Sequence, residues 1–167
     1  MLKESLLDIL AASVPGLALE LSENLHREFN YDVVASPSEK IMQVLNPFHK
    51  QDDALKKNWY EHSDKKSILF VAPPDERIGR WLAKAVYESR KGATVIGILP
   101  LRADKEWFHK YILGVAAEVR FVKVLKSSVL GIPIPFVPIA VVVFKDFKGT
   151  TRFTSARYNG EVTEHLN

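Results

Sequence analysis

The feature that most constrains the fold is a pair of apolar segments with one amphipathic segment between them. Residues Ser67 to Val71 are apolar after the first position, and Pro73-Pro74 ends the run abruptly. The next segment has an apolar residue every three to four positions, at Ile78, Trp81, Leu82, Ala85 and Val86. Gly92 is a typical helix stop, and Ala93 to Leu99 is again almost entirely apolar. A strand, a helix and a strand in this order predict neighbouring parallel strands joined by a right-handed crossover.

Weaker patterns extend this unit in both directions. We predict further helices over residues 6–10, 17–29, 38–44 and 104–113, and strands over residues 31–35, 118–124 and 139–144. The last strand is uninterrupted by polar residues, which predicts a central place in the sheet. Residues 46–64 are polar and irregular, and predict a mobile loop. The stretch around residues 50–66 would either close over a ligand or simply be a loop.

These elements predict an α/β fold with a largely parallel sheet and flanking helices. We expect one domain over residues 1–150, because the length suits a single core and no internal repeat is visible. Residues 151–167 are polar, and predict a C-terminal extension that forms an edge strand or a flexible tail.

The composition excludes several kinds of site. The 167 residues include no cysteine, which excludes disulfides, thiol catalysis and Cys-ligated metals. The five histidines lack metal-ligand spacing, and there is no glycine-rich phosphate loop. The longest uncharged run, residues 127–144, contains three prolines that disfavour a membrane helix. We therefore expect an intracellular protein with no metal and no membrane partner, whose net charge of +3 is compatible with DNA.

Several motifs, in their order along the chain, resemble one enzyme family. The similar segments are Glu28–Ala35, Asp53–Trp59, Phe70–Asp75, Ile78–Ala85, Lys91–Pro100, Trp107–His109, Ala117–Lys123 and Pro135–Phe144. In this order and spacing, over roughly residues 15 to 145, the chain resembles the phage-type (Dam-like) family of DNA N6-adenine methyltransferases. The resemblance implies the Rossmann-like sheet of a class I methyltransferase, and a phage-infected host cell as its setting.

The resemblance also implies a reaction. The family transfers a methyl group from S-adenosylmethionine to the N6 atom of an adenine that is flipped out of the duplex, so S-adenosylmethionine is the implied cofactor and DNA the implied partner. In the family motif Asn/Asp-Pro-Pro-Tyr, the first side chain and a proline carbonyl accept the hydrogens of that nitrogen, and the aromatic residue stacks on the base. Here the motif reads Ala72-Pro73-Pro74-Asp75. Ala72 has no acceptor and Asp75 no stacking face, whereas Pro73 and Pro74 keep the turn and its carbonyls.

Further site residues are predicted from strand ends, because ligands of such sheets bind outside the carboxyl ends of the strands. The ends at residues 32–36, 72–75 and 99–102 predict cofactor contacts from Asp32, Ala35 and Leu99. For Asp32 the alternative is a turn carboxylate. The residues predicted to face nucleic acid are Arg77, Arg80, Arg102, Trp107 and His109. The alternatives are solvated arginines and a helix that packs on the sheet.

Three interpretations of function remain open. The first is an active or weakly active S-adenosylmethionine-dependent DNA methyltransferase. The second is a catalytically silent relative, kept as a binding or structural subunit with a protein partner. The Ala72 and Asp75 substitutions in the motif favour the second over efficient adenine methylation. The third is a methyltransferase with another acceptor, in which Asp75 serves as a base.

Overall fold

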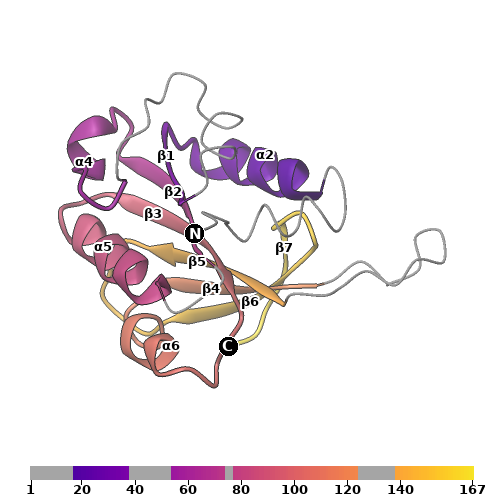
Figure 1. Cartoon of the computed structure of the whole chain (residues 1–167). Coiled ribbons are helices and arrows are strands. Elements are labelled where there is room, and N and C mark those ends of the chain that lie inside the picture. The colour runs from indigo at the N-terminus through magenta and orange to yellow at the C-terminus, as the bar shows by residue number, and fades with distance from the viewer. Residues whose placement is uncertain (1–16, 38–53, 74–76, 124–137) are drawn as a thin grey trace.

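A seven-stranded β-sheet forms the centre of the molecule (Figure 1). The computed structural model describes residues 17–37, 54–73, 77–123 and 138–167. Its strands are β1 (Val33–Ala35), β2 (Ser67–Val71), β3 (Thr94–Pro100), β4 (Glu118–Val122), β5 (Ile139–Phe144), β6 (Arg152–Ala156) and β7 (Val162–His165). Its helices are α2 (Leu17–Phe29), α4 (Trp59–His62), α5 (Ile78–Arg90) and α6 (Glu106–Tyr111). The helices predicted over residues 6–10 and 38–44 lie outside the described residues.

The strand order is β1-β2-β3-β5-β4-β6-β7. β1, β2 and β3 pair in parallel, and β5 lies antiparallel between β3 and β4. β6 continues the sheet in parallel with β4, and β7 closes it antiparallel to β6. This order is consistent with the Rossmann-like sheet of class I methyltransferases, which confirms the predicted fold class. β5 has the predicted central place, and β5 and β7 are the two exceptions to a parallel sheet.

Helices cover both faces of the sheet. On one face, α4, α5 and α6 enclose the larger hydrophobic core, in which every predicted apolar position of α5 is buried. On the other face, Leu21 and Leu25 of α2 pack on β1, β2, β3 and β5. α2 and β2 have the predicted bounds. α5 ends just before Gly92, whose φ of 110° allows the left-handed turn predicted there.

Four aromatic side chains form the centre of the larger core. Phe70 of β2 lies beside Trp59, Trp81 and Phe144, with ring centroids 6.1 to 6.5 Å away. The Phe70 ring lies over Gly97 of β3, because a Cβ atom at Gly97 would be only 2.6 Å from Phe70 Cζ. The two residues are register partners in the parallel β2–β3 pair. The missing side chain at Gly97 therefore makes room for the ring that holds this core together.

The prediction of a mobile loop over residues 46–64 is wrong for the part that the structure describes, residues 54–64. Trp59 is 2% exposed, and its indole nitrogen donates a hydrogen bond to the Ala54 carbonyl at 2.8 Å. The backbone N–H of Tyr60 is bonded to Glu88 of α5. The free energy gained by burying the Trp59 side chain thus fixes this segment on the sheet, although most of its other residues are polar.

The C-terminal residues form the two strands β6 and β7. β6 pairs with β4 from Glu118–Arg152 to Val122–Ala156, and β7 lies at the edge. The turn between them packs on α2, where a Cβ atom at Gly160 would lie 2.8 Å from Leu21 Cδ1 and 3.4 Å from Leu25 Cδ2. This segment is therefore an integral part of the sheet.

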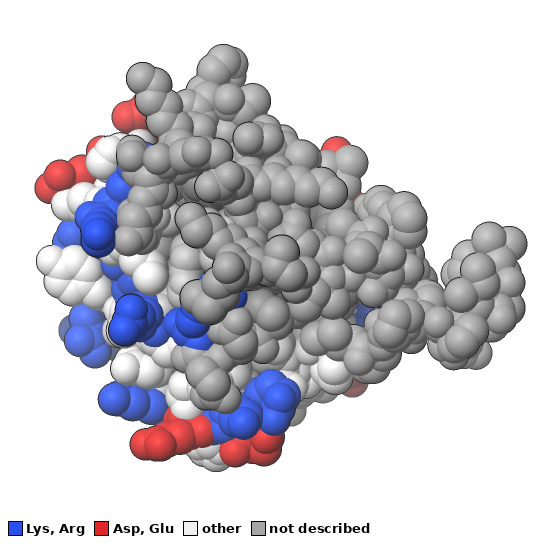
Figure 2. All heavy atoms as spheres, in the orientation of Figure 1, with Lys and Arg blue, Asp and Glu red and all other residues white. Residues whose placement is uncertain are grey.

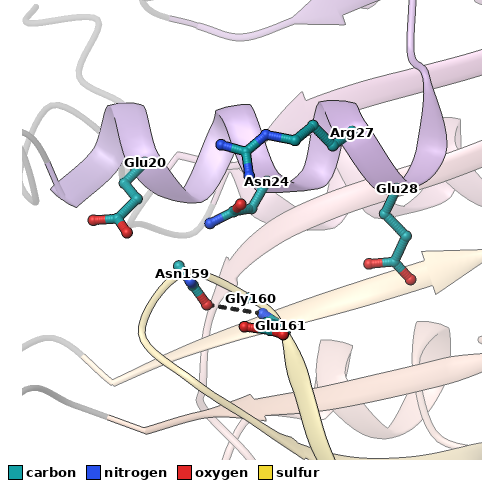
Figure 3. Close-up of a pocket in the computed structure, with 7 residues that line it drawn as sticks. All are labelled: Glu20, Asn24, Arg27, Glu28, Asn159, Gly160 and Glu161. Carbon is teal, nitrogen blue, oxygen red and sulfur yellow. Dashed lines mark hydrogen bonds between the residues drawn. The ribbon is translucent and has the colours of Figure 1, made fainter.

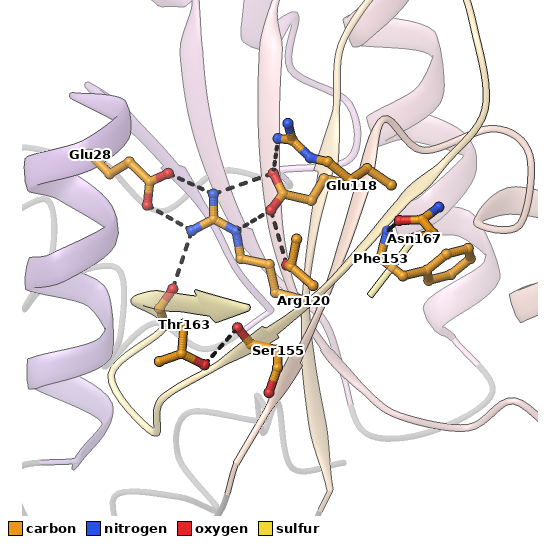
Figure 4. Close-up of polar contacts among 10 residues, drawn as sticks. Glu28, Glu118, Arg120, Phe153, Ser155, Thr163 and Asn167 are labelled. Carbon is orange, nitrogen blue, oxygen red and sulfur yellow. Dashed lines mark hydrogen bonds and ion pairs between the residues drawn. The ribbon is translucent and has the colours of Figure 1, made fainter. Parts of the chain in front are cut away.

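An ion network with a buried centre at Arg120 and Glu118 connects these strands to α2 through the exposed Glu28 (Figure 4). Arg120 of β4, with a 3% exposed side chain, makes two hydrogen bonds to Glu28 of α2, at 2.6 and 2.7 Å. Its Nε atom donates to Glu118 at 3.0 Å, and its Nη1 atom donates to the Gly160 carbonyl. Arg152 and Thr154 of β6 also donate to Glu118. Each buried charge therefore has several partners, as burial of charges requires.

We predict that Gly97→Ala destabilises the protein, because the new methyl group would overlap the Phe70 ring. Overpacking of this kind lowers the free energy of unfolding by about 1–3 kcal/mol, measurable by urea denaturation. Gly79→Ala is the matched control, because a Cβ atom at Gly79 of α5 meets no heavy atom within 4 Å. That helical site should gain up to about 1 kcal/mol. Equal effects of the two substitutions would contradict the described packing.

We predict that Arg120→Gln lowers the free energy of unfolding by about 3–5 kcal/mol, because it leaves buried carboxylate charge without its main partner. The control is Arg157→Gln, since Arg157 and Glu161 form an ion pair in which both side chains are 62% exposed. An exposed pair contributes at most about 1 kcal/mol. Denaturation curves of the two variants test this contrast, and a mild effect of Arg120→Gln would show that the network is dispensable.

The same network predicts a loss of stability in acid. Burial raises the pKa of Glu118, but the charge of Arg120 and hydrogen bonds from Arg120 and Arg152 outweigh it, so the pKa lies below its ordinary value of 4.5. This stabilisation is complete above pH 4.5 and is lost as the pH falls through the lowered pKa. Glu118→Gln should therefore be less stable than the wild type at neutral pH and approach it in acid. Curves of unfolding free energy against pH that run parallel for the two proteins would contradict this.

Candidate functional site

Three parallel strands end side by side at one edge of the sheet. The register places Ala35 of β1 beside Phe70 of β2, and Val71 of β2 beside Ile98 of β3. The chain leaves these strands after Ala35, Val71 and Pro100. In open α/β sheets, ligands bind outside such carboxyl ends. The predicted site residues Ala35, Ala72 and Leu99 are therefore brought to the same edge, which we call the carboxyl edge.

The diproline turn begins directly at this edge. Ala72 follows β2, and its backbone N–H donates to the Ile98 carbonyl at 3.1 Å, as the last bond of the β2–β3 pair. Pro73 has no N–H to continue the ladder, so the chain turns away. Both residues are buried, and Ala72, at 0% exposure, belongs to the larger core. Pro74 and Asp75 lie outside the described residues. The first motif position is thus a buried methyl group with no side-chain acceptor.

The two apolar residues predicted to contact the cofactor lie beneath the carboxyl edge. Ala35 is 1% exposed and Leu99 is 0% exposed, and both belong to the larger core. Both side chains are therefore packed inside the core and present almost no surface to a ligand. A polar contact with a ligand would have to come from other residues.

Asp32 lies at the amino ends of the parallel strands, opposite the carboxyl edge, because it precedes β1 and does not follow it. Its carboxylate accepts hydrogen bonds from the Ser63 hydroxyl and from the Lys65 backbone N–H. Burial raises the pKa of Asp32, but these hydrogen bonds outweigh that effect and lower it. The position favours the alternative interpretation, a turn carboxylate that fastens residues 63–65 to the start of β1.

The predicted arginines lie around the carboxyl edge in different surroundings. Arg77 precedes the first residue of α5, and Arg80 is exposed on the first turn of that helix. Arg102 follows β3, and its guanidinium makes two hydrogen bonds to Asp104, at 2.7 and 2.8 Å. This ion pair lowers the pKa of Asp104 to about 2. The charge of Arg102 is therefore already balanced, which weakens its prediction as a phosphate ligand.

Trp107 and His109 both belong to α6, which follows the carboxyl end of β3. Trp107 is partly buried against the larger core, with its ring 5.9 Å from that of Phe108. His109 is exposed, and its Nε2 atom lies 2.8 Å from the Ala103 carbonyl. Trp107 thus fits the alternative of a helix that packs on the sheet, while His109 stays a prediction for the nucleic-acid surface.

Two hollows on the surface are lined entirely by described residues. The larger, about 470 Å³, lies between α2 and the turn before β7, where Glu20, Asn24 and Glu28 extend from the helix toward residues 159–161 (Figure 3). The second, about 310 Å³, lies near the start of β4 and includes Lys145 and Arg152. Neither includes a residue predicted for the site. Sequence patterns gave no sign of either, because each is formed by segments that are distant along the chain.

The described residues contain neither a metal-binding group of side chains nor a helix that could span a membrane. Among them, no group of three or more His, Asp or Glu side chains is arranged to hold a metal ion. None of the helices in residues 17–37, 54–73, 77–123 and 138–167 has both the length and the apolar content needed to cross a bilayer.

Comparison with known proteins places the chain in a family. Among curated proteins, no sequence matches the chain. A family model described as "DNA N-6-adenine-methyltransferase (Dam)" matches residues 15–163, which is almost the whole chain. The match includes β1 to β6, the diproline turn and the helices α2 to α6. The chain therefore belongs to the Dam family of DNA N6-adenine methyltransferases.

Proposed function

We propose that this protein is a DNA N6-adenine methyltransferase-like protein whose methyl transfer to adenine is weak or absent. The observation that carries the proposal is Ala72, a buried alanine at the end of β2 where the family motif has Asn or Asp. Asp75 supports it, because the aromatic residue of the motif is also replaced. DNA is the proposed partner, in an intracellular setting where DNA and S-adenosylmethionine are both present.

The chemistry explains why these two positions matter. The exocyclic nitrogen of adenine is a poor nucleophile, because its lone pair is delocalised into the ring. Hydrogen-bond acceptors at its two hydrogens localise that lone pair, and the Pro73 carbonyl would still supply one of them. The second acceptor is missing at Ala72, and loss of one such preorganised contact lowers a rate by about 10²–10³. Loss of the stacking residue removes about 1–3 kcal/mol of base binding.

The proposed cofactor is S-adenosylmethionine, which supplies the methyl group in this family. The described residues at the carboxyl edge fit it only in part. Ala35 and Leu99 are apolar and buried at this edge, and Asp32, the acid predicted to bind a hydroxyl or amine, lies at the amino ends of the strands. The nearby Asp104 is paired with Arg102. We therefore propose cofactor binding at this edge and assign no polar ligand to it.

The burial of Ala72 and Pro73 favours a second candidate, a silent subunit that uses the fold for binding alone. A turn whose first two residues are packed in the core offers less surface to a flipped base. Such a subunit would keep its stable fold and show no turnover. Cofactor binding and methyl transfer, measured separately, distinguish the two candidates.

We predict that the double substitution Ala72→Asn with Asp75→Tyr raises methyl transfer to adenine at least about tenfold, because it restores the second acceptor and the stack. The assay follows labelled methyl groups from S-adenosylmethionine to duplex DNA, alongside calorimetry of cofactor binding. The matched control is Ala72→Leu with Asp75→Tyr, since leucine has the size of asparagine without its acceptor. Thermal unfolding of both variants shows whether position 72 tolerates the larger side chain.

Three outcomes decide the matter. Cofactor binding by the wild type and a gain confined to the Asn-containing variant support the proposed function. A folded Asn-containing variant that binds the cofactor without any gain contradicts the role given to Ala72. No cofactor binding by any of the proteins contradicts the enzyme-like function and leaves the silent subunit.

A further inference from the structure

The helix that begins beside the diproline turn, together with its two flanking residues, has a larger net positive charge than the whole protein. Residues 77–91 contain five cations and one carboxylate, which leaves a charge of +4, whereas the whole chain has +3. The rest of the protein is thus close to neutral. Figure 2 shows lysine and arginine side chains gathered over α4 and α5, with acidic side chains above and below them. Such concentration on one helix is an electrostatic feature of nucleic-acid-binding surfaces.

Four side chains along α5 form one continuous stripe. Arg80, Lys84, Tyr87 and Lys91 are spaced at i, i+4, i+7 and i+11, so they share one face of the helix. We call these four residues the α5 stripe. Arg80 is exposed and Tyr87 is 58% exposed, although tyrosine is a large and partly apolar residue. At 1.5 Å per residue, the stripe is about 16 Å long, enough to follow two or three phosphates of one DNA strand.

The contacts of the lysines hold the stripe in position. Lys84 lies 2.6 Å from one oxygen of the buried Glu88 carboxylate, and Lys91 lies 3.6 Å from the other. The two ammonium groups lie 5.7 and 4.5 Å from the centre of the Tyr87 ring. One buried acid thus orients two cations around an exposed phenol and neutralises only one of them. Among the described residues, Arg80 has no carboxylate partner.

We propose that the α5 stripe binds the phosphate backbone of double-stranded DNA next to the base presented at the diproline turn. This inference rests on the proposed function, from which DNA is taken as the partner. α5 starts at the carboxyl edge, so DNA whose base reaches that edge would extend along the helix. Ordered cations and a tyrosine hydroxyl are typical backbone ligands that fix position without reading sequence. An anionic membrane fits less well, because the stripe offers no apolar face beyond Tyr87.

The experiment measures DNA binding without any chemistry. Fluorescence anisotropy follows the full chain on a labelled 20-base-pair duplex that contains only G·C pairs, without S-adenosylmethionine, at several salt concentrations. The test variant is Arg80→Gln with Lys91→Gln, which leaves Lys84 in place to balance Glu88. The control is Lys145→Gln with Lys148→Gln, which removes the same charge from exposed positions between β5 and β6. Thermal unfolding confirms that both variants fold.

We expect the test variant to bind about tenfold more weakly at low salt, and its slope of log affinity against log salt to fall by about 2. The control variant should keep both values. Because the duplex has no adenine, this result stands even if methyl transfer proves absent. Equal losses of DNA affinity in the two variants would show that only the net charge of the protein matters, and would overturn the inference. Binding to phosphatidylserine vesicles, but not to DNA, would overturn it in favour of a membrane.

Discussion

The position of the candidate site depends on the packing of one ring against one glycine. Phe70 lies over Gly97, and this contact places β2 and β3 in register and brings Trp59 and Trp81 onto the same face. The chain leaves the sheet at Ala72, only two residues later. Where the diproline turn emerges, and where α5 begins, are therefore consequences of the aromatic core. The site is built directly on this aromatic core.

The two halves of the sheet are held by different kinds of interaction. Around β2 and β3 the contacts are apolar, whereas β4 and β6 are joined to α2 by Arg120, Glu118 and Glu28. A buried ion network adds less net stability than an apolar core of the same size, but each member strictly requires its partners. The network therefore fixes how the C-terminal strands meet α2. The charges on α5 differ, because only Glu88 is buried and the cations reach the surface.

Sequence patterns predicted the elements whose residues repeat with a clear period. The apolar stripe of α5 and the uninterrupted apolar run of β5 fixed the fold class and the place of the diproline turn. They did not predict the fixed position of Trp59. Its neighbours along the chain are polar, and it is buried because it packs against Phe70 of β2. Asp32 was assigned to the wrong end of its strand, since β1 begins one residue after it. Arg120 was missed because a charged residue in an alternating strand is normally taken to face solvent.

The position of β5 between β3 and β4 has a consequence for when the sheet can be completed. β2 pairs with β1 and with β3, and all three strands lie before residue 101. β4 pairs only with β5 and β6, both of which follow it along the chain. During synthesis, β4 therefore waits without a strand partner until residues 139–144 have left the ribosome. The C-terminal strands can therefore join β1, β2 and β3 in one sheet only once β5 has paired with the β3 edge.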